Sequence, residues 1–254
     1  MRASGERDAV TVWVVDAARA AAEALPMLEA LLDAEERARM ARFRFERDRA
    51  LHTVARGALR LVLGRTLGLD PRTLAFAAAP GGKPHLAAPT ADLRFNLSHT
   101  GGRVLVALAR GVELGVDVEA LDRKVDWRGV GRMVAAPEEM AALEAAPPDR
   151  AAAVFFRLWT AKEAYIKALG TGIGHPLRET CFAIADGEEL RLVHDRSRPP
   201  PPGGWTVRAL DAGDGYAACL AHPGPPRPLV VRRLEEWTQH PPGPTVGEAG
   251  GTGS

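Results

Sequence analysis

Two acidic residues in one short segment have a spacing that suits a cation site. In GVELGVDVE (111–119), Asp117 and Glu119 are two residues apart in a strand-like run, so both side chains point to the same face. Val116 and Val118 alternate with them and point toward a core. Neighbouring carboxylates repel each other unless they are solvated or a cation bridges them. Taken alone, the pair favours a solvated strand end, with a metal site as the alternative.

A second candidate group lies on one stripe of the long helix predicted over residues 149–170. Trp159, Glu163 and Lys167 are spaced at i, i+4 and i+8. Glu163 and Lys167 are in the favourable order for a surface ion pair, which contributes a few tenths of a kcal/mol and is the simplest interpretation. Aromatic neighbours such as Phe156 indicate instead that this part of the helix packs against other elements.

Asn96, Ser98 and His99 lie in FNLSHTG (95–101), at the predicted end of a strand and the start of a turn. Neighbouring Ser and His suggest a hydrolase. However, adjacent strand residues point to opposite faces, and the sequence lacks the Gly-x-Ser-x-Gly elbow. A catalytic triad is therefore disfavoured. The segment is interpreted either as a polar turn or as a contact for an anion such as phosphate.

GGKP (81–84) is a predicted turn with phosphate-binding potential. Glycines such as Gly82 permit a close backbone approach to a ligand, and Lys83 supplies a compact positive charge that can meet a phosphate. The segment lacks the spacing of a P-loop, so by itself it is a weak signal.

The elements that must position these residues are two long helices and several short strands. Helices are predicted over 22–41, 48–68 and 149–170, the last two ending at glycines. Strands are predicted over 11–16, 74–79, 93–98, 104–110, 180–186, 205–211 and 216–222. A long helix followed by three strands occurs twice, which indicates a duplicated α+β unit with 111–119 near the junction.

Composition excludes several classes of protein. Apolar residues make up 46% and charged residues 26%, which excludes wholesale disorder. The net charge of +1 leaves no general basic field for nucleic acid or an anionic membrane, and no apolar run reaches the ~20 residues of a spanning helix. The charged N-terminus argues against a signal peptide, and the two cysteines, Cys181 and Cys219, are too few for a disulfide framework or a zinc cage. We therefore expect a soluble, cytoplasmic protein.

In their order and spacing, GGKP, FNLSH, GVDVE and FFRLWTAKEAYIKALGTG resemble the 4′-phosphopantetheinyl transferases, in particular the larger, two-lobed class that activates surfactin synthetase. The resemblance runs from about Leu32 to about His222. It implies an α+β fold of two similar lobes, each a long helix packed on a small, mainly antiparallel sheet, related by a pseudo-twofold axis with the cofactor in the cleft. The implied parts are an N-terminal lobe (1–112) and a C-terminal lobe (113–238). The residues that follow have almost no apolar side chain to bury, so their composition predicts a disordered tail (239–254).

The resemblance also implies a reaction. Such enzymes transfer the 4′-phosphopantetheine arm of coenzyme A to a serine hydroxyl of an apo acyl or peptidyl carrier protein and release adenosine 3′,5′-bisphosphate. By resemblance, Asp117, Glu119 and Glu163 would hold Mg²⁺, Glu163 would be the general base, and Lys167 would steady the phosphate oxygens and the leaving group. Three carboxylates make a hard oxygen site of the kind that Mg²⁺ prefers.

The remaining implied contacts concern coenzyme A and the carrier. The positions that would contact coenzyme A are Arg39, Gly82, Lys83, Asn96, Ser98, His99, Asp117 and Lys167. The carrier would dock beside the cleft, and we expect residues 121–134 to contribute because they combine basic and apolar side chains. Relatives imply a monomer. Two alternatives are a non-catalytic homologue that binds coenzyme A or a carrier, and a Mg²⁺-dependent phosphohydrolase that cleaves coenzyme A.

Overall fold

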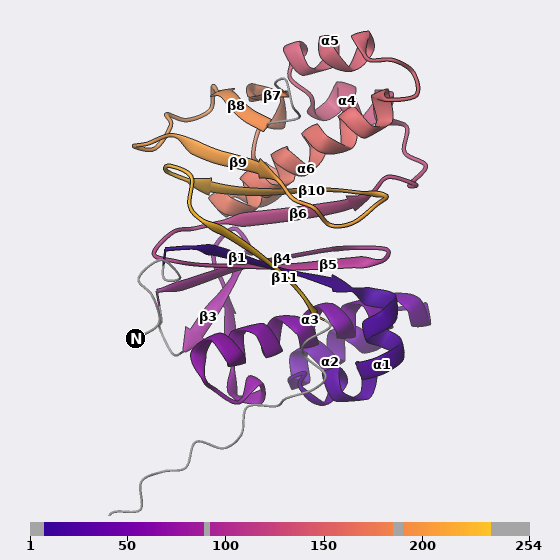
Figure 1. Ribbon diagram of the computed structural model, residues 1–254, viewed down its shortest axis with the longest axis vertical. Coiled ribbons are helices and arrows are strands. Elements are labelled where there is room, and N and C mark those ends of the chain that lie inside the picture. The colour runs from indigo at the N-terminus through magenta and orange to yellow at the C-terminus, as the bar shows by residue number, and fades with distance from the viewer. Residues whose placement is uncertain (1–7, 89–91, 185–189, 235–254) are drawn as a thin grey trace, which may run out of the picture.

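The computed structural model describes residues 8–88, 92–184 and 190–234. Its first half consists of a strand, three helices and two β-hairpins (Figure 1). A short 3₁₀ turn, Pro71–Thr73, follows the third helix. The elements are β1 (Val10–Asp16), α1 (Ala17–Ala30), α2 (Ala34–Ala41), α3 (Glu46–Leu67), β2 (Ala75–Ala78), β3 (Pro84–Ala88), β4 (Leu93–Thr100) and β5 (Arg103–Arg110).

The second half repeats this order and adds one strand. Two 3₁₀ turns, Gly172–Gly174 and Leu177–Glu179, follow its long helix. The elements are β6 (Gly115–Ala120), α4 (Trp127–Val134), α5 (Pro137–Ala145), α6 (Ala151–Leu169), β7 (Thr180–Ile184), β8 (Leu190–Asp195), β9 (Trp205–Ala209), β10 (Tyr216–Pro223) and β11 (Leu229–Arg233).

The sheet topology confirms the predicted duplication. The first sheet has the order β11-β1-β5-β4 and the second the order β6-β10-β9. In each half the opening strand pairs antiparallel with the last strand of the second hairpin: β1 with β5, and β6 with β10. The first hairpin of each half, β2-β3 or β7-β8, forms a separate two-stranded sheet. Two similar α+β lobes are therefore present, as expected.

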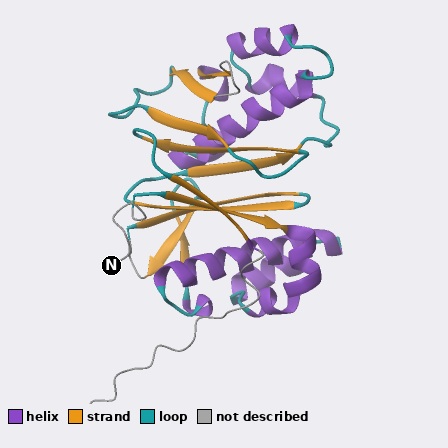
Figure 2. Ribbon diagram, viewed as in Figure 1, coloured by secondary structure: helices purple, strands orange, loops and turns teal. Residues whose placement is uncertain are grey.

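The two larger sheets face each other at the centre of the molecule, with helices on both outer sides (Figure 2). Strand alternation explains these layers. Val10, Val12 and Val14 of β1 lie in the core between the sheets, whereas Trp13 and Val15 lie in the core of the first lobe. A third core, which includes Phe155 and Phe156 of α6, fills the second lobe. The lobes thus share an apolar interface along their sheets.

Both long helices end where the sequence predicts. Gly68 follows α3 and Gly170 follows α6, each in the left-handed conformation with φ of 70°. Glycine adopts this conformation without the steric cost that a Cβ imposes, which is why it ends helices so often. The predicted helix over 22–41 is instead two helices, because Asp33 caps the start of α2 and forms a capping box with Glu36.

In the described residues, four strands follow the long helix of the first half and five follow that of the second, rather than the predicted three in each. The predictions missed β3 and β8, the second strands of the two small hairpins, and β11. They also missed α4 and α5, whose eight and nine residues are too short for a clear helical period.

The chain returns to the first lobe at β11. This strand pairs in parallel with β1, so residues 229–233 belong to the first sheet although the expected boundaries place them in the second lobe. The boundaries at 112 and 238 otherwise stay a prediction, and the expected tail (239–254) lies outside the described residues. None of the helices in the described part of the chain is long and apolar enough to cross a membrane.

Candidate active site

Gly115 allows β6 to lie unusually close to α6. A Cβ at this position would be 2.0 Å from the carbonyl oxygen of Ala164 and 2.4 Å from the amide nitrogen of Ala168, distances that real Cβ atoms do not reach. Glycine at the start of GVDVE therefore lets the strand with Asp117 pack directly against the helix with Lys167. The sequence shows a glycine at position 115, but it does not show the close contact with α6 that requires one.

Lys167 lies at the centre of the polar groups between β4, β6 and α6. Its Nζ is 2.6 Å from Asp117 Oδ1, 3.1 Å from Ser98 Oγ and 3.3 Å from the carbonyl oxygen of Val116. Ser98 also donates a hydrogen bond to Asp117 Oδ1 at 2.8 Å. Lys167 therefore pairs with the strand carboxylate and not, as the simplest sequence interpretation held, with Glu163 in a surface ion pair.

Asp117, Glu119 and Glu163 lie in one neighbourhood. Burial raises the pKa of Glu163, and the negative charges of Asp117 and Glu119 raise it further, while Lys167 opposes them. Burial also raises the pKa of Asp117, against the stabilising effect of Lys167 and Ser98. The helix α6 packs against other elements, as its aromatic residues predicted, and Asp117 and Glu119 both lie near Glu163 of this helix, which agrees with the prediction that these two acids share a face.

The donor set suits a hard divalent cation. Asp117 is 5% exposed, and its Oδ2 is buried with no hydrogen-bond partner. A buried carboxylate oxygen without a partner is costly, and a bound cation would remove that cost. The donor oxygens of Asp117, Glu119 and Glu163 do not all lie within 4.8 Å of one another. Among the described residues, the only trio of possible ligands that meets this limit is Glu138, Cys181 and His194.

Glu119 has three polar partners other than Asp117 and Glu163. Arg123 forms an ion pair with its Oε2, Thr100 donates to the same oxygen at 3.4 Å, and Trp159 Nε1 donates to Oε1 at 3.3 Å. Trp159 was visible on the helix stripe, and Arg123 lies four residues after Glu119. The contact from Thr100 follows the two-residue alternation of β4, which extends beyond the predicted strand.

β4 presents a row of polar side chains to the open edge of β6. Asn96 Oδ1 accepts the Val116 N–H at 2.9 Å, and Ser98 Oγ accepts the Val118 N–H at 3.3 Å. These side chains supply partners to backbone groups that an edge strand otherwise leaves unpaired. Asn96 and Ser98 are both 5% exposed. In the structure, both side chains link the first lobe to the second. Their contact with coenzyme A stays a prediction.

His99 lies in the strand itself, since β4 continues to Thr100, rather than in a turn. Its side chain is exposed, yet the surrounding protein lowers its pKa, chiefly by removing water and then through the positive charges of Lys167, His52 and Arg39. Lys167 of α6 and Arg39 of α2 are the permanent cations among them, because burial also lowers the pKa of His52. A cationic neighbourhood that favours an anion therefore surrounds His99.

Arg39 borders a surface pocket on α2. The pocket has a volume of about 490 Å³ and is lined by Glu35, Ala38, Arg39, Arg42 and Phe43. None of the three candidate metal ligands lines it.

The GGKP turn packs against the end of α6. A Cβ on Gly81 would be 1.8 Å from the carbonyl oxygen of Gly170, so the close approach that glycine permits is to the protein itself. Gly82 has φ of 80°, which favours glycine in the turn. Lys83 Nζ is 2.6 Å from Glu113 Oε2 and 2.9 Å from the carbonyl oxygen of Leu114. To bind a phosphate, Lys83 would have to leave these partners, and its contact with a phosphate stays a prediction.

Comparison with known proteins agrees with the motifs. Residues 113–221 match the family model described as the 4′-phosphopantetheinyl transferase superfamily, and residues 19–110 match that of the N-terminal part of a 4′-phosphopantetheinyl transferase. The chain is 35% identical to the 4′-phosphopantetheinyl transferase HetI of a Nostoc species, over 78% of this chain and 81% of the relative. It is 29% identical to a Bacillus subtilis 4′-phosphopantetheinyl transferase, over 76% and 84% respectively.

Among solved structures, the holo-[acyl-carrier-protein] synthase of Thermotoga maritima is similar over 45% of this chain and 64% of that chain, with 23% identity and a TM-score of 0.37. The two family models together span both lobes, and the Nostoc relative aligns over most of its own length. On this sequence similarity, the chain belongs to the 4′-phosphopantetheinyl transferase superfamily.

Proposed function

We propose that the cluster between β4, β6 and α6 transfers the 4′-phosphopantetheine arm of coenzyme A to a serine hydroxyl of an apo carrier protein. The observation that supports this most is the meeting of Asp117, Glu163 and Lys167 in a chain of this family, with one carboxylate oxygen buried and unpartnered. In the reaction the serine Oγ bonds to phosphorus and the bond from phosphorus to the leaving adenosine 3′,5′-bisphosphate breaks.

Mg²⁺ is the cation that the site would hold. Asp117, Glu119 and Glu163 are the proposed ligands, because carboxylate oxygens are hard donors and Asp117 Oδ2 has no other partner. When bound, the ion would neutralise charge on the diphosphate and on the leaving group. Binding requires Glu119 to turn from Arg123 and Trp159 toward the other two acids.

Glu163 is the proposed general base. A serine hydroxyl is a poor nucleophile at neutral pH, so a nearby group must take its proton as the new bond forms. Burial and two acidic neighbours raise the pKa of Glu163, which makes its ionised form a stronger base than an ordinary carboxylate. Lys167, one helical turn away, keeps a positive charge beside it for the phosphate oxygens and the departing phosphate.

Coenzyme A would lie between the lobes. His99 and Arg39 belong to the same cationic neighbourhood and are the proposed contacts for the 3′-phosphate end. Gly82, Lys83, Asn96 and Ser98 are further proposed contacts on the first lobe. Lys83, Asn96 and Ser98 already have protein partners and would bind the ligand only by sharing or exchanging them.

The carrier protein is proposed to dock on α4. This helix combines exposed Arg128 and Arg132 with Met133, which is 68% exposed, and Arg128 lies over the ring of Trp127 with 4.3 Å between Cζ and the ring centroid. Basic and apolar groups side by side suit an acidic carrier surface with an apolar centre. Cytoplasmic location and a monomeric state are further expectations of the same proposal.

A mass measurement tests the function. The protein is incubated with coenzyme A, Mg²⁺ and an apo carrier protein, and the carrier is then weighed. The proposal expects the carrier to gain the mass of phosphopantetheine, and expects Glu163→Gln to abolish the gain while coenzyme A still binds. Cleavage of coenzyme A without that gain would identify a phosphohydrolase, and binding without cleavage a non-catalytic homologue. Either result contradicts the proposal.

A further inference from the structure

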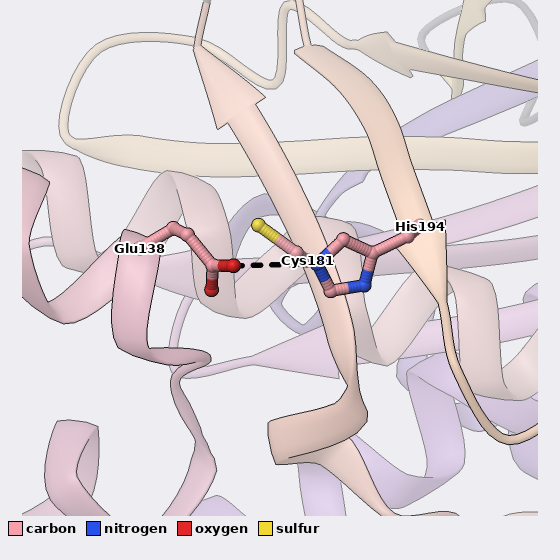
Figure 3. A group of neighbouring side chains, drawn as sticks. All are labelled: Glu138, Cys181 and His194. Atoms are coloured by element: carbon pink, nitrogen blue, oxygen red, sulfur yellow. Dashed lines mark ion pairs between the residues drawn. The ribbon is translucent and has the colours of Figure 1, made fainter.

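A second group of possible metal ligands lies in the second lobe, apart from the acids around Lys167. Glu138 lies in the first turn of α5, Cys181 on β7 and His194 on β8 (Figure 3). Cys181 and His194 are directly paired across the β7-β8 hairpin, so the ladder places their side chains as immediate neighbours. One donor atom from each of the three residues lies within 4.8 Å of the other two.

The imidazole is already oriented as in a metal site. His194 Nδ1 is 3.3 Å from the carbonyl oxygen of Glu179. The tautomer that donates the Nδ1 proton to this carbonyl has its lone pair on Nε2, the arrangement usual for metal-binding histidines. Nε2 is buried and has no hydrogen-bond partner. Its charged neighbour among these residues is the Glu138 carboxylate, with 3.6 Å between Nε2 and Oε1, and Cys181 lies beside both (Figure 3).

The distance between the nitrogen and oxygen donors is close to that of a tetrahedral site. Bonds of about 2.1 Å from a tetrahedral Zn²⁺ to nitrogen and oxygen separate two such ligands by about 3.4 Å. His194 Nε2 and Glu138 Oε1 are 3.6 Å apart. All three donor atoms lie within 4.8 Å of one another, and Glu138 is exposed, so its side chain has room to move toward the other two.

We propose that Glu138, Cys181 and His194 bind a thiophilic divalent cation, with Zn²⁺ the best match to one sulfur, one nitrogen and one oxygen donor and with water as the fourth ligand. Mg²⁺ prefers oxygen donors and is excluded on that ground. Binding breaks the S–H bond of Cys181, whose proton leaves to solvent, and forms the metal–sulfur bond. Arg196 Nη2, 3.2 Å from Glu138 Oε1, is a competitor for the carboxylate.

Such an ion would fasten α5 to the β7-β8 hairpin. The residue after Glu138 already joins the same elements, since Glu139 Oε1 accepts the Phe182 N–H at 2.8 Å and Oε2 lies 2.8 Å from Lys162 Nζ of α6. The metal would add a second link on the solvent side of this contact. Because it binds only the folded arrangement, it should raise the melting temperature.

Cobalt(II) provides a direct readout that does not depend on transferase activity. The chelator-treated full-length protein is titrated with Co²⁺, whose bond to a thiolate gives a charge-transfer band in the near ultraviolet. We expect a band at one equivalent, and its loss on addition of Zn²⁺. Cys181→Ser should abolish the band, whereas Cys219→Ser should keep it, because Cys219 is equally buried but lies in a different strand.

Surface variants keep the test decisive if Cys181→Ser fails to fold. Glu138→Gln and His194→Gln should each weaken Co²⁺ binding at least about tenfold, and Arg196→Gln should strengthen it. In thermal melts, Zn²⁺ should raise the melting temperature of the parent protein but not of His194→Gln. The proposal is overturned if no thiolate band forms, if the band survives in Cys181→Ser, or if Glu138→Gln and His194→Gln bind as tightly as the parent.

Discussion

The two long helices, α3 and α6, occupy equivalent places in the duplicated lobes. They share one feature and differ in another. Arg60 of α3 and Lys162 of α6 each lie eight residues before the glycine that ends the helix, and both are almost fully buried. Each pairs with a glutamate in the first turn of the preceding short helix, at 2.6 Å in the first lobe and 2.8 Å in the second. The glutamates are Glu36 and Glu139.

The correspondence extends to the backbone. Arg60 donates to the carbonyl oxygens of Pro71 and Leu74, and Lys162 donates to those of Leu177 and Thr180, in each case in the segment that follows the helix. The next residue on each helix differs in kind: Leu61 in α3 and Glu163 in α6. The buried cation therefore belongs to the scaffold that both lobes share, whereas the candidate chemistry is confined to one helix.

The largest expected effect is on activity and distinguishes the two helices. Glu163→Gln should lower the turnover of carrier modification by about 10²–10⁴-fold, the usual contribution of a general base. Leu61→Met, at the equivalent place in α3, should change turnover less than about threefold because it conserves volume and polarity. Initial rates of carrier mass gain measure both. Similar losses in the two variants would show that the helices are not functionally different.

Removal of the buried cation should destabilise both lobes, and the second lobe more. Lys162→Met leaves Glu139 buried without its charged partner and should lower the free energy of unfolding by about 3–5 kcal/mol. Arg60→Met should cost less, because Glu36 keeps a second ion pair with Arg56 at 2.6 Å. Urea unfolding measures the change. Adding Glu139→Gln to Lys162→Met should recover part of the loss, because a neutral side chain tolerates burial better than an unpaired carboxylate. If either variant left the free energy of unfolding unchanged, the two buried cations would not have equivalent structural roles.

Gly115→Ala should damage the second lobe through packing alone. The added methyl group would overlap Ala164 and Ala168 of α6, so β6 and α6 must separate. We expect a loss of about 1–3 kcal/mol in the free energy of unfolding and a lower turnover, since Asp117 and Lys167 move apart. Gly101→Ala, where a Cβ meets nothing within 4 Å, is the matched control. A normal rate in Gly115→Ala would mean that close contact of strand and helix is unnecessary.

The smallest effect concerns the surface. Reversing charge with Arg128→Glu and Arg132→Glu on α4 should raise the KM for the carrier by roughly tenfold and leave coenzyme A affinity unchanged. Arg44→Glu and Arg47→Glu form the control in the first lobe, since these exposed arginines flank Phe45, which is 51% exposed. Carrier titrations measure KM. An unchanged KM in the α4 variant, or an equal rise in the control, would remove α4 as the docking surface.

The sequence predicted the parts of the molecule that depend on local pattern. The long helices have enough turns to show their period, and their terminal glycines mark their ends. The shared face of Asp117 and Glu119 follows from strand alternation alone. Helices of eight or nine residues and strands in small hairpins leave too few positions for such a signal, so α4, α5, β3 and β8 were missed.

Contacts between the lobes could not be predicted, because they depend on how two distant strands are aligned. Asn96 and Ser98 have partners on β6 only because the edges of the two sheets meet in one register. Lys167 likewise finds Asp117 rather than Glu163, since Gly115 brings strand and helix together. Alternation along β4 would have predicted that residues 96, 98 and 100 share a face, but not what that face meets.

The return of β11 to the first sheet has a consequence for how the chain becomes a folded protein. Until residues 229–233 emerge during synthesis, β1 has an open edge that β11 will later cover. An unpaired strand edge is a template for association with other chains. The first lobe therefore completes its sheet only after the second lobe has been made, and a fragment cut between the lobes should aggregate where the whole chain stays folded.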